Sequence, residues 1–173
     1  MDAVPTSKGF GPVARPDARV LILGSLPGQM SLARREYYAM PRNAFWPIMA
    51  RLVGASPELS YEKRLQRLIE KRIALWDVCA EGRRPGSLDH RIETASALAN
   101  DFFAFLTAHP HIRRICFNGA KAEWLYRRMV APTLPAALAE TPSVLLPSTS
   151  PAHAGMPFER KLEHWREALR DFL

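Results

Sequence analysis

The feature that most constrains the fold is an apolar run that stops abruptly at a glycine-rich turn. Arg19 is followed by Val-Leu-Ile-Leu at residues 20–23 and then by Gly-Ser-Leu-Pro-Gly at residues 24–28. A continuous apolar run of this length is typical of a strand that is covered on both faces. Two glycines and a proline end such a strand and let the backbone approach another group closely. We therefore predict a buried strand over residues 19–23 whose carboxyl end opens into a binding loop.

Strands and helices alternate along the rest of the chain. We predict further strands over residues 73–78, 112–117 and 144–146, and helices over residues 45–53, 61–72, 95–107, 120–129 and 157–172. This order predicts an α/β fold, a three-layer αβα sandwich with a central, mostly parallel four-stranded sheet. We expect residues 1–18 to form a loose N-terminal arm and residues 19–173 to form a single domain.

The loops after the four strands carry the unusual residues of the chain. They are GSLPG after the first strand, CAEGRRPGSLD after the second, NG after the third and PSTSPAH after the fourth. The carboxyl ends of parallel strands meet at one edge of the sheet, and ligands of open α/β sheets bind at that edge. We therefore expect these four loops to line one crevice.

Composition and charge narrow the class of protein. Hydrophobic residues make up 47% of the 173 residues and charged residues 24%, and the net charge of +7 favours polyanionic partners. No apolar run approaches the roughly 20 residues of a membrane span, and no leader peptide is visible. We therefore expect a cytoplasmic monomer, associated with the nucleoid in a bacterium, without a membrane partner. The isolated Cys79 and Cys116 and the lone pair His109 and His111 predict neither a metal site nor a cofactor.

Two side chains after the first strand could bind a flat ligand. Tyr38 could stack on a base, because aromatic faces bind bases with little selectivity. Asn43 could cap the helix that begins at Phe45, or its amide could pair with a base edge. The spacing alone does not decide between these two roles.

Polar residues in the other loops could contact an anion. Arg83 and Arg84 could bind phosphate or could form a solvated loop. Ser148, Ser150 and His153 lie in a proline-bounded turn that suits phosphate or sugar contacts, but equally an ordinary hydroxyl-stabilised turn. A serine hydrolase is not indicated, since the chain has no G-x-S-x-G elbow and no acid obviously paired with His153.

Taken together, these motifs resemble the uracil-DNA glycosylase superfamily. The GSLPG turn is similar to its first motif, YAMPRNAFW to the stretch that follows in the mismatch-specific branch, and LPSTSPAH to its last motif. More narrowly, the segments YYAMPRNAFW, ALWDVC with GSLD after it, FNGAKA and LPSTSPA resemble the hypoxanthine-DNA glycosylase family, which acts on deoxyinosine. The resemblance runs from about residue 20 to residue 154.

The resemblance implies a DNA base-excision repair enzyme that takes a deaminated base, above all hypoxanthine, out of double-stranded DNA. It implies hydrolysis of the N-glycosidic bond without strand cleavage and without a cofactor, with Asn43 as the catalytic residue. Base binding is implied for Gly24, Ser25, Leu26, Tyr38 and Asn43. DNA binding is implied for Arg83, Arg84, Ser87, Ser148, Ser150 and His153.

Two departures from the superfamily pattern keep alternatives open. Leu26 stands where the uracil-excising branches have an Asp or Asn that handles the attacking water, and Ser148 stands where other branches have His or Asn. Leucine cannot orient water, which favours the hypoxanthine family and leaves the group that activates water unassigned. The alternatives are a uracil or mismatch glycosylase on the same fold and a module that binds damaged DNA without cutting it.

Overall fold

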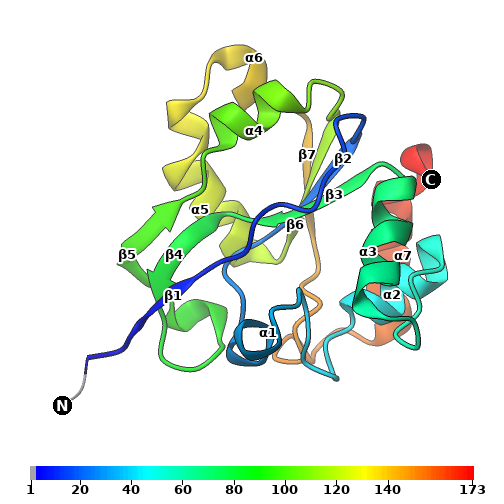
Figure 1. Ribbon diagram of the computed structural model, residues 1–173, viewed down its shortest axis with the longest axis horizontal. Coiled ribbons are helices and arrows are strands. Elements are labelled where there is room, and N and C mark those ends of the chain that lie inside the picture. The colour runs from blue at the N-terminus through cyan, green and yellow to red at the C-terminus, as the bar shows by residue number, and fades with distance from the viewer. Residues whose placement is uncertain (1–2) are drawn as a thin grey trace.

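The centre of the fold is a four-stranded sheet in the computed structural model, which describes residues 3–173 (Figure 1). Its strands are β2 Val20–Gly24, β3 Ile73–Asp77, β6 Arg114–Asn118 and β7 Ser143–Leu146, in the order β3-β2-β6-β7. All three pairings are parallel. The interior strand β2 is buried along its whole length, as its continuous apolar run requires. The predicted strands are confirmed to within two residues at each end.

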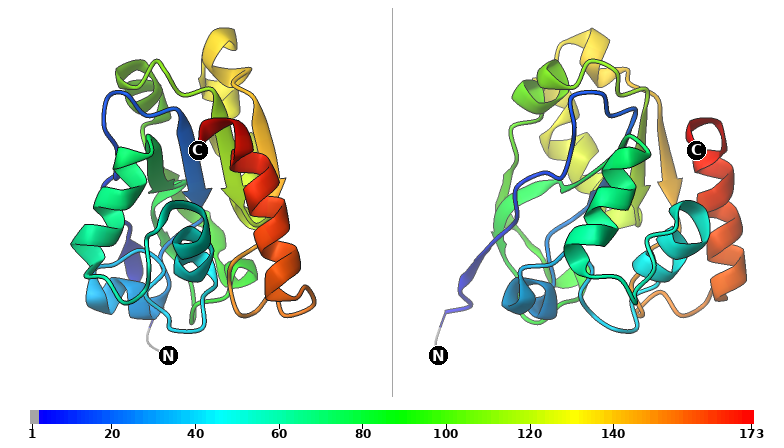
Figure 2. Two further views of the ribbon diagram at one scale, coloured as in Figure 1. Left: turned by 90° about the vertical axis from the view of Figure 1, so that its right-hand side faces the viewer. Right: turned by 45° about the vertical axis from the view of Figure 1, so that its right-hand side comes forward.

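Helices cover both faces of this sheet. Leu21 and Leu23 of β2 face one apolar core, and Val20 and Ile22 face the other, as the period of two in a strand dictates. The helices of the first face are α4 Phe102–Ala108, α5 Ala120–Met129 and α6 Ala136–Ala139, and those of the second are α2 Phe45–Val53, α3 Tyr61–Glu70 and α7 Phe158–Leu169. Figures 1 and 2 show the two sets on opposite sides of the sheet, which confirms the three-layer αβα sandwich.

A second, antiparallel sheet was not expected from the sequence. It has the order β1-β4-β5 and consists of β1 Thr6–Lys8, β4 Cys79–Arg83 and β5 Glu93–Ala99. The segment 79–89 was expected as a loop, yet its first half forms β4. The sequence of this segment, which contains Gly and Arg, has no alternating apolar pattern that would predict a strand. Its hydrogen bonds to β1 and β5 make it one.

The helix predicted over residues 95–107 is wrong in its first half. Residues 95–99 belong to β5, and helix α4 begins only at Phe102. Asp101 caps this helix, because its side chain accepts a hydrogen bond of 3.0 Å from the Ala104 N–H. The alanines of β5 favour a helix locally, but pairing with β4 overrides that preference.

The N-terminal segment packs against the domain from residue 6 onward. The expectation of a loose arm is therefore wrong for this part of the chain. Residues 1–2 lie outside the described range. Strand β1 pairs with β4, and Val13 forms a bridge with Leu75 of β3. The Trp76 indole N–H donates to the Phe10 carbonyl at 3.1 Å. Phe10 and Val13 pack on the core, which explains why a Pro- and Gly-rich segment is held in place.

The remaining elements are short. They are α1 Gln29–Arg34 and the 3-10 helices η1 Asp89–Arg91, η2 Ala131–Thr133 and η3 Arg170–Phe172. Within residues 3–173, no helix has the length and hydropathy needed to cross a membrane.

Candidate active site

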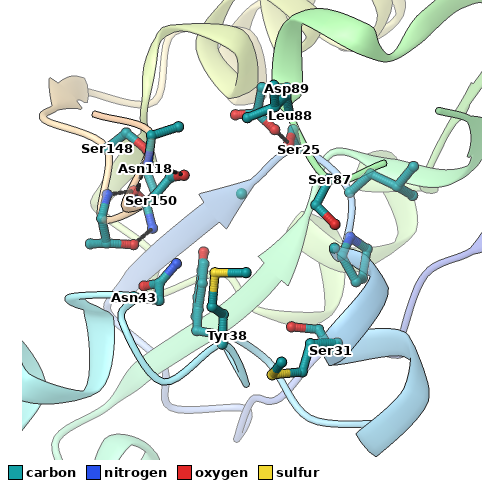
Figure 3. A pocket seen from close by; sticks show the side chains of 18 of the residues that line it. Ser25, Ser31, Tyr38, Asn43, Ser87, Leu88, Asp89, Asn118, Ser148 and Ser150 are labelled. Carbon is teal, nitrogen blue, oxygen red and sulfur yellow. Dashed lines mark hydrogen bonds between the residues drawn. The ribbon is translucent and has the colours of Figure 1, made fainter. Parts of the chain in front are cut away.

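A pocket of about 380 Å³ opens at the carboxyl edge of the central sheet (Figure 3). It is lined by residues at or just beyond the carboxyl ends of all four parallel strands, by α1 and by the segment between α1 and α2. The expectation that the four loops line one crevice is confirmed. Of the residues named from the sequence, Gly24, Ser25, Leu26, Tyr38, Asn43, Arg84, Ser87, Ser148 and Ser150 line this pocket.

Tyr38 forms an aromatic wall of the pocket. Its ring stacks on the fully buried Phe45, with centroids 4.2 Å apart and planes inclined by 29°. Tyr38 also has a left-handed backbone with φ of 55°, a conformation that costs energy for a bulky residue. The next residue is held by a 3.1 Å hydrogen bond from the Ala39 N–H to Ser31 Oγ. This strain and the fixed ring indicate a built platform rather than an incidental surface tyrosine.

Asn43 accepts a hydrogen bond at the start of a helix and also lines the pocket, so its position is compatible with both of the roles considered from the sequence. Its Oδ1 accepts a hydrogen bond of 2.9 Å from the Phe45 N–H at the start of α2. This bond fixes the amide, and its nitrogen points toward Tyr38 (Figure 3). Because the oxygen is already occupied, Asn43 presents N–H donors to the pocket.

The GSLPG loop is held rigid by its own polar atoms. The Gly24 and Ser25 carbonyls accept from the N–H groups of residues 78 and 79 at 2.9 and 3.0 Å. Ser25 Oγ donates to Asp89 Oδ1 at 2.6 Å. The Leu26 side chain is buried in a core of the domain, so it offers no polar group to a ligand or to water. Ser87 accepts from the Gln29 N–H at 2.9 Å and closes the loop from the opposite side.

Arg84 does not lie where a DNA phosphate could reach it, which corrects the expectation from the sequence. Its side chain is only 2% exposed. The guanidinium donates to the Leu26 and Pro27 carbonyls at 3.1 and 2.6 Å and pairs with Asp89 at 3.4 Å. Arg84 therefore pins the GSLPG loop. The neighbouring Arg83 is 46% exposed and pairs with Glu93 at 3.2 Å, outside the pocket.

The loop after β7 is tied to the rest of the site by Asn118, a residue that sequence reasoning missed. Its side chain donates to Thr149 Oγ1 and accepts from the Thr149 N–H, both at 2.9 Å. The Thr149 carbonyl in turn accepts from the Ala44 N–H at 2.9 Å. Ser148 Oγ accepts from the Ser150 N–H at 3.1 Å, as in an ordinary hydroxyl-stabilised turn.

His153 lies in a neighbouring hollow rather than in the pocket itself. Its side chain is exposed, and its N–H donates to the Ser150 carbonyl at 3.0 Å. The structure therefore keeps His153 beside the mouth of the site and brings it no acidic partner among residues 3–173.

The second residue missed from the sequence is Asp77. It ends strand β3, lines the pocket and is 4% exposed. Burial, and to a lesser degree the charge of Asp89, raise the pKa of the Asp77 carboxyl to about 7, and Arg84 opposes this rise. The signal in the sequence is an acidic residue at the end of an otherwise apolar strand, a position that the strand pattern alone does not mark as functional.

Replacing Gly24 by alanine is expected to lower the rate of any reaction in this pocket by about 100-fold. An added Cβ would lie 2.5 Å from Asp77 Oδ1 and 2.9 Å from the Tyr38 hydroxyl, so both side chains must shift. Gly11→Ala is the matched control, because a Cβ there meets nothing within 4 Å. Comparing turnover of the two variants checks the expectation, and equal rates would contradict it.

Comparisons with known proteins agree with this geometry. Residues 11–173 match the family model of the uracil DNA glycosylase superfamily. A Methanosarcina acetivorans protein named hypoxanthine DNA glycosylase is 40% identical over 116 residues, which are 66% of this chain and 72% of that protein. A Methanosarcina barkeri protein of the same name is 35% identical over 116 residues, with the same shares of 66% and 72%.

A solved structure extends the match to the whole fold. The solution NMR structure of a protein from Methanosarcina acetivorans, provisionally described as a uracil DNA glycosylase, superposes with a TM-score of 0.77 and 33% identity. The match covers 97% of this chain and 99% of that chain. The chain therefore belongs to the uracil DNA glycosylase superfamily.

Proposed function

We propose that this protein is a monofunctional DNA glycosylase that removes hypoxanthine from DNA. The family supports base excision, and the two relatives at 40% and 35% identity are named for hypoxanthine. The observation that carries the proposal is the Tyr38 ring, backed by Phe45 and facing the amide nitrogen of Asn43. A flat base that enters the pocket meets an aromatic face and hydrogen-bond donors at its edge.

The damaged nucleotide must leave the duplex to reach this pocket. Unstacking costs a few kcal/mol and is cheapest for a poorly paired base, which gives the enzyme part of its selectivity. The net charge of +7 favours binding to the phosphate backbone. Arg42 at the pocket and the half-exposed Arg83 are available for such contacts, together with Ser150 and His153 at the mouth.

The chemistry follows from the donors that surround the base. As the C1′–N9 bond lengthens, the sugar becomes oxocarbenium-like and negative charge grows on the departing purine. Donors that are already oriented stabilise such charge without further reorganisation. Asn43 supplies N–H groups for this purpose, and Tyr38 holds the ring in place. The buried Leu26 side chain cannot activate water, which argues against the uracil-type arrangement at this position.

Strand cleavage is not part of the proposal. A Schiff-base intermediate needs a lysine within reach of C1′, and no lysine lines the pocket in the described part of the chain. Lys121, the nearest candidate from the sequence, lies on α5 with its Nζ 4.5 Å from the centre of the Trp124 ring. Lys161 lines only the neighbouring hollow.

Excision from end-labelled duplexes tests the function directly. The duplexes carry one deoxyinosine or one deoxyuridine, and alkali reveals the abasic sites. We expect cutting at deoxyinosine that depends on alkali. Cutting mainly at deoxyuridine would move the protein to the uracil-excising alternative, and binding without cutting would move it to the class of damage-binding modules. Strand breaks before alkali treatment would contradict a monofunctional enzyme.

A further inference from the structure

Asp77 lines the pocket, yet the proposed mechanism gives it no part. It pairs in register with Gly24 at the carboxyl ends of β3 and β2. Its Oδ1 and the Tyr38 hydroxyl lie 2.5 and 2.9 Å from the point where a Gly24 side chain would begin. The absence of a side chain at residue 24 is therefore what gives the Asp77 carboxyl access to the base-binding face of the pocket.

The carboxyl of Asp77 is buried without a partner of its own. Its Oδ2 has no hydrogen-bond partner within residues 3–173, and the residue is 4% exposed. Buried polar groups are nearly always hydrogen-bonded, so an unpaired one that lines a cavity is a candidate for a functional contact. The backbone carbonyl of Asp77 already has a partner, since it accepts a hydrogen bond of 2.8 Å from the Asn100 side-chain amide. The side chain remains available for a bound molecule.

The charged groups around Asp77 do not neutralise it. Asp89 on η1 repels a charge on Asp77. Arg84, beyond β4, attracts it, but the guanidinium is bonded to the Leu26 and Pro27 carbonyls and to Asp89. The remaining titratable neighbours are the Cys79 thiol on β4, the phenols Tyr37 and Tyr38 from the segment before α2, and the Tyr61 phenol at the start of α3. In each of these four the pKa is raised, by burial above all and by Asp77 in addition, so they are neutral.

A carboxyl group in such a place is useful to a glycosylase only in one of its two states. The neutral acid carries an O–H donor beside its carbonyl acceptor, which matches the N–H and C=O of a lactam edge such as that of hypoxanthine. The carboxylate has acceptors only and repels the negative charge that grows on a departing base. An apolar site can keep an acid neutral so that it donates a hydrogen bond.

We propose that Asp77 is a second catalytic residue, which acts as a neutral carboxylic acid and donates a hydrogen bond to the departing base. This inference rests on the proposed glycosylase function. The C1′–N9 bond breaks with its electron pair going to the purine, water forms the new C1′–O bond and loses a proton to solvent, and the released purine anion takes up a proton from solvent. The Asp77 proton stays on the carboxyl group, which ends the cycle as it began.

The role predicts an unusual response to asparagine at this position. The side chain introduced by Asp77→Asn has the shape and the donor of the neutral acid, but it cannot ionise. Single-turnover excision of deoxyinosine by the wild type should therefore fall about tenfold per pH unit above pH 7, as Asp77 loses its proton. The Asp77→Asn variant should match the wild type within about threefold at pH 6 and exceed it at pH 9. Because residue 77 cannot ionise in this variant, any pH dependence of its excision rate in this range measures titration of the substrate or of another group.

Two further variants complete the test. Asp77→Ala should be about 100-fold slower than the wild type at pH 6, because it removes the donor altogether, and the two rates should converge toward pH 9, where the wild type has lost the donor as well. Asp89→Asn should move the falling limb of the wild-type profile to lower pH, because one source of repulsion is removed. Circular dichroism and thermal melts verify that each variant is folded.

The outcomes are distinct. If Asp77→Asn is folded and binds the inosine duplex but is inactive at every pH, the carboxylate itself is required and the proposal is overturned in favour of a general base. If Asp77→Asn keeps the falling limb of the wild type, a different group titrates and the proposal also fails. If the wild type does not excise deoxyinosine at any pH, the proposed function fails before Asp77 is in question.

Discussion

Changing Asn43 to aspartate is expected to lower the rate of deoxyinosine excision by about 10²–10³-fold while the protein stays folded. The side-chain oxygen that accepts from the Phe45 N–H is kept, and aspartate is as good a helix cap as asparagine. The nitrogen that points into the pocket is replaced by a second oxygen, which repels a base that gains negative charge. Single-turnover excision and thermal melting measure the two effects separately.

The matched control for this variant is Gln29→Glu. Gln29 also lines the pocket but lies exposed at its rim, so the change introduces the same negative charge without touching the donor. We expect it to cost only the affinity that one added charge removes from a protein–DNA complex. Asn43→Ala should lose both excision and about 1 kcal/mol of stability, because the cap is lost too. Wild-type excision by Asn43→Asp would exclude Asn43 as the donor.

Removal of Arg84 is expected to have the largest effect on stability. In Arg84→Ala the Leu26 and Pro27 carbonyls lose donors at 3.1 and 2.6 Å, and Asp89 loses its 3.4 Å partner. A buried acceptor that is left unpaired costs about 1–3 kcal/mol, so we expect the free energy of unfolding to fall by about 3 kcal/mol. Urea denaturation of the wild type and of the variant measures this loss of stability. Excision should fall as well, because the GSLPG loop loses its anchor.

Arg83→Ala is the control for this change, since it removes the same charge one residue away. Arg83 is half exposed and forms a surface ion pair with Glu93, so its loss should change stability by less than about 1 kcal/mol. If Arg83 touches the DNA backbone, the slope of log affinity against log salt should fall by about 1. Equal losses of stability in the two variants would contradict the buried role of Arg84.

The sequence was sufficient for the parts of the fold that rest on local patterns. The apolar runs of β2 and β3 mark buried strands by themselves, and the parallel order then places their carboxyl ends together. The sequence was misleading where pairing decides the structure. Residues 95–99 are rich in alanine and look helical, but the partner strand β4 makes them β5.

The candidate site divides in the same way. Asn43 and Tyr38 could be predicted from the sequence because they lie in the segment YYAMPRNAFW, which is distinctive enough to be matched to a family motif. Arg83 and Arg84 are identical in type and adjacent, so no local pattern could say which of them turns inward. The sequence does not single out Asp77, because it reads as the last residue of a predicted strand. Only the structure shows that its carboxyl group is buried, unpaired and next to Gly24.

The pairing of β1 with β4 also bears on solubility. A strand edge with free N–H and C=O groups can recruit a strand from another molecule and start aggregation. Strand β1 occupies that edge of β4 through the register Thr6 to Arg83 and Lys8 to Glu81. It is itself only three residues long, follows Pro5 and ends in a lysine, three features that discourage a further strand from adding. This N-terminal strand thus shields the β4 side of the small sheet from intermolecular pairing.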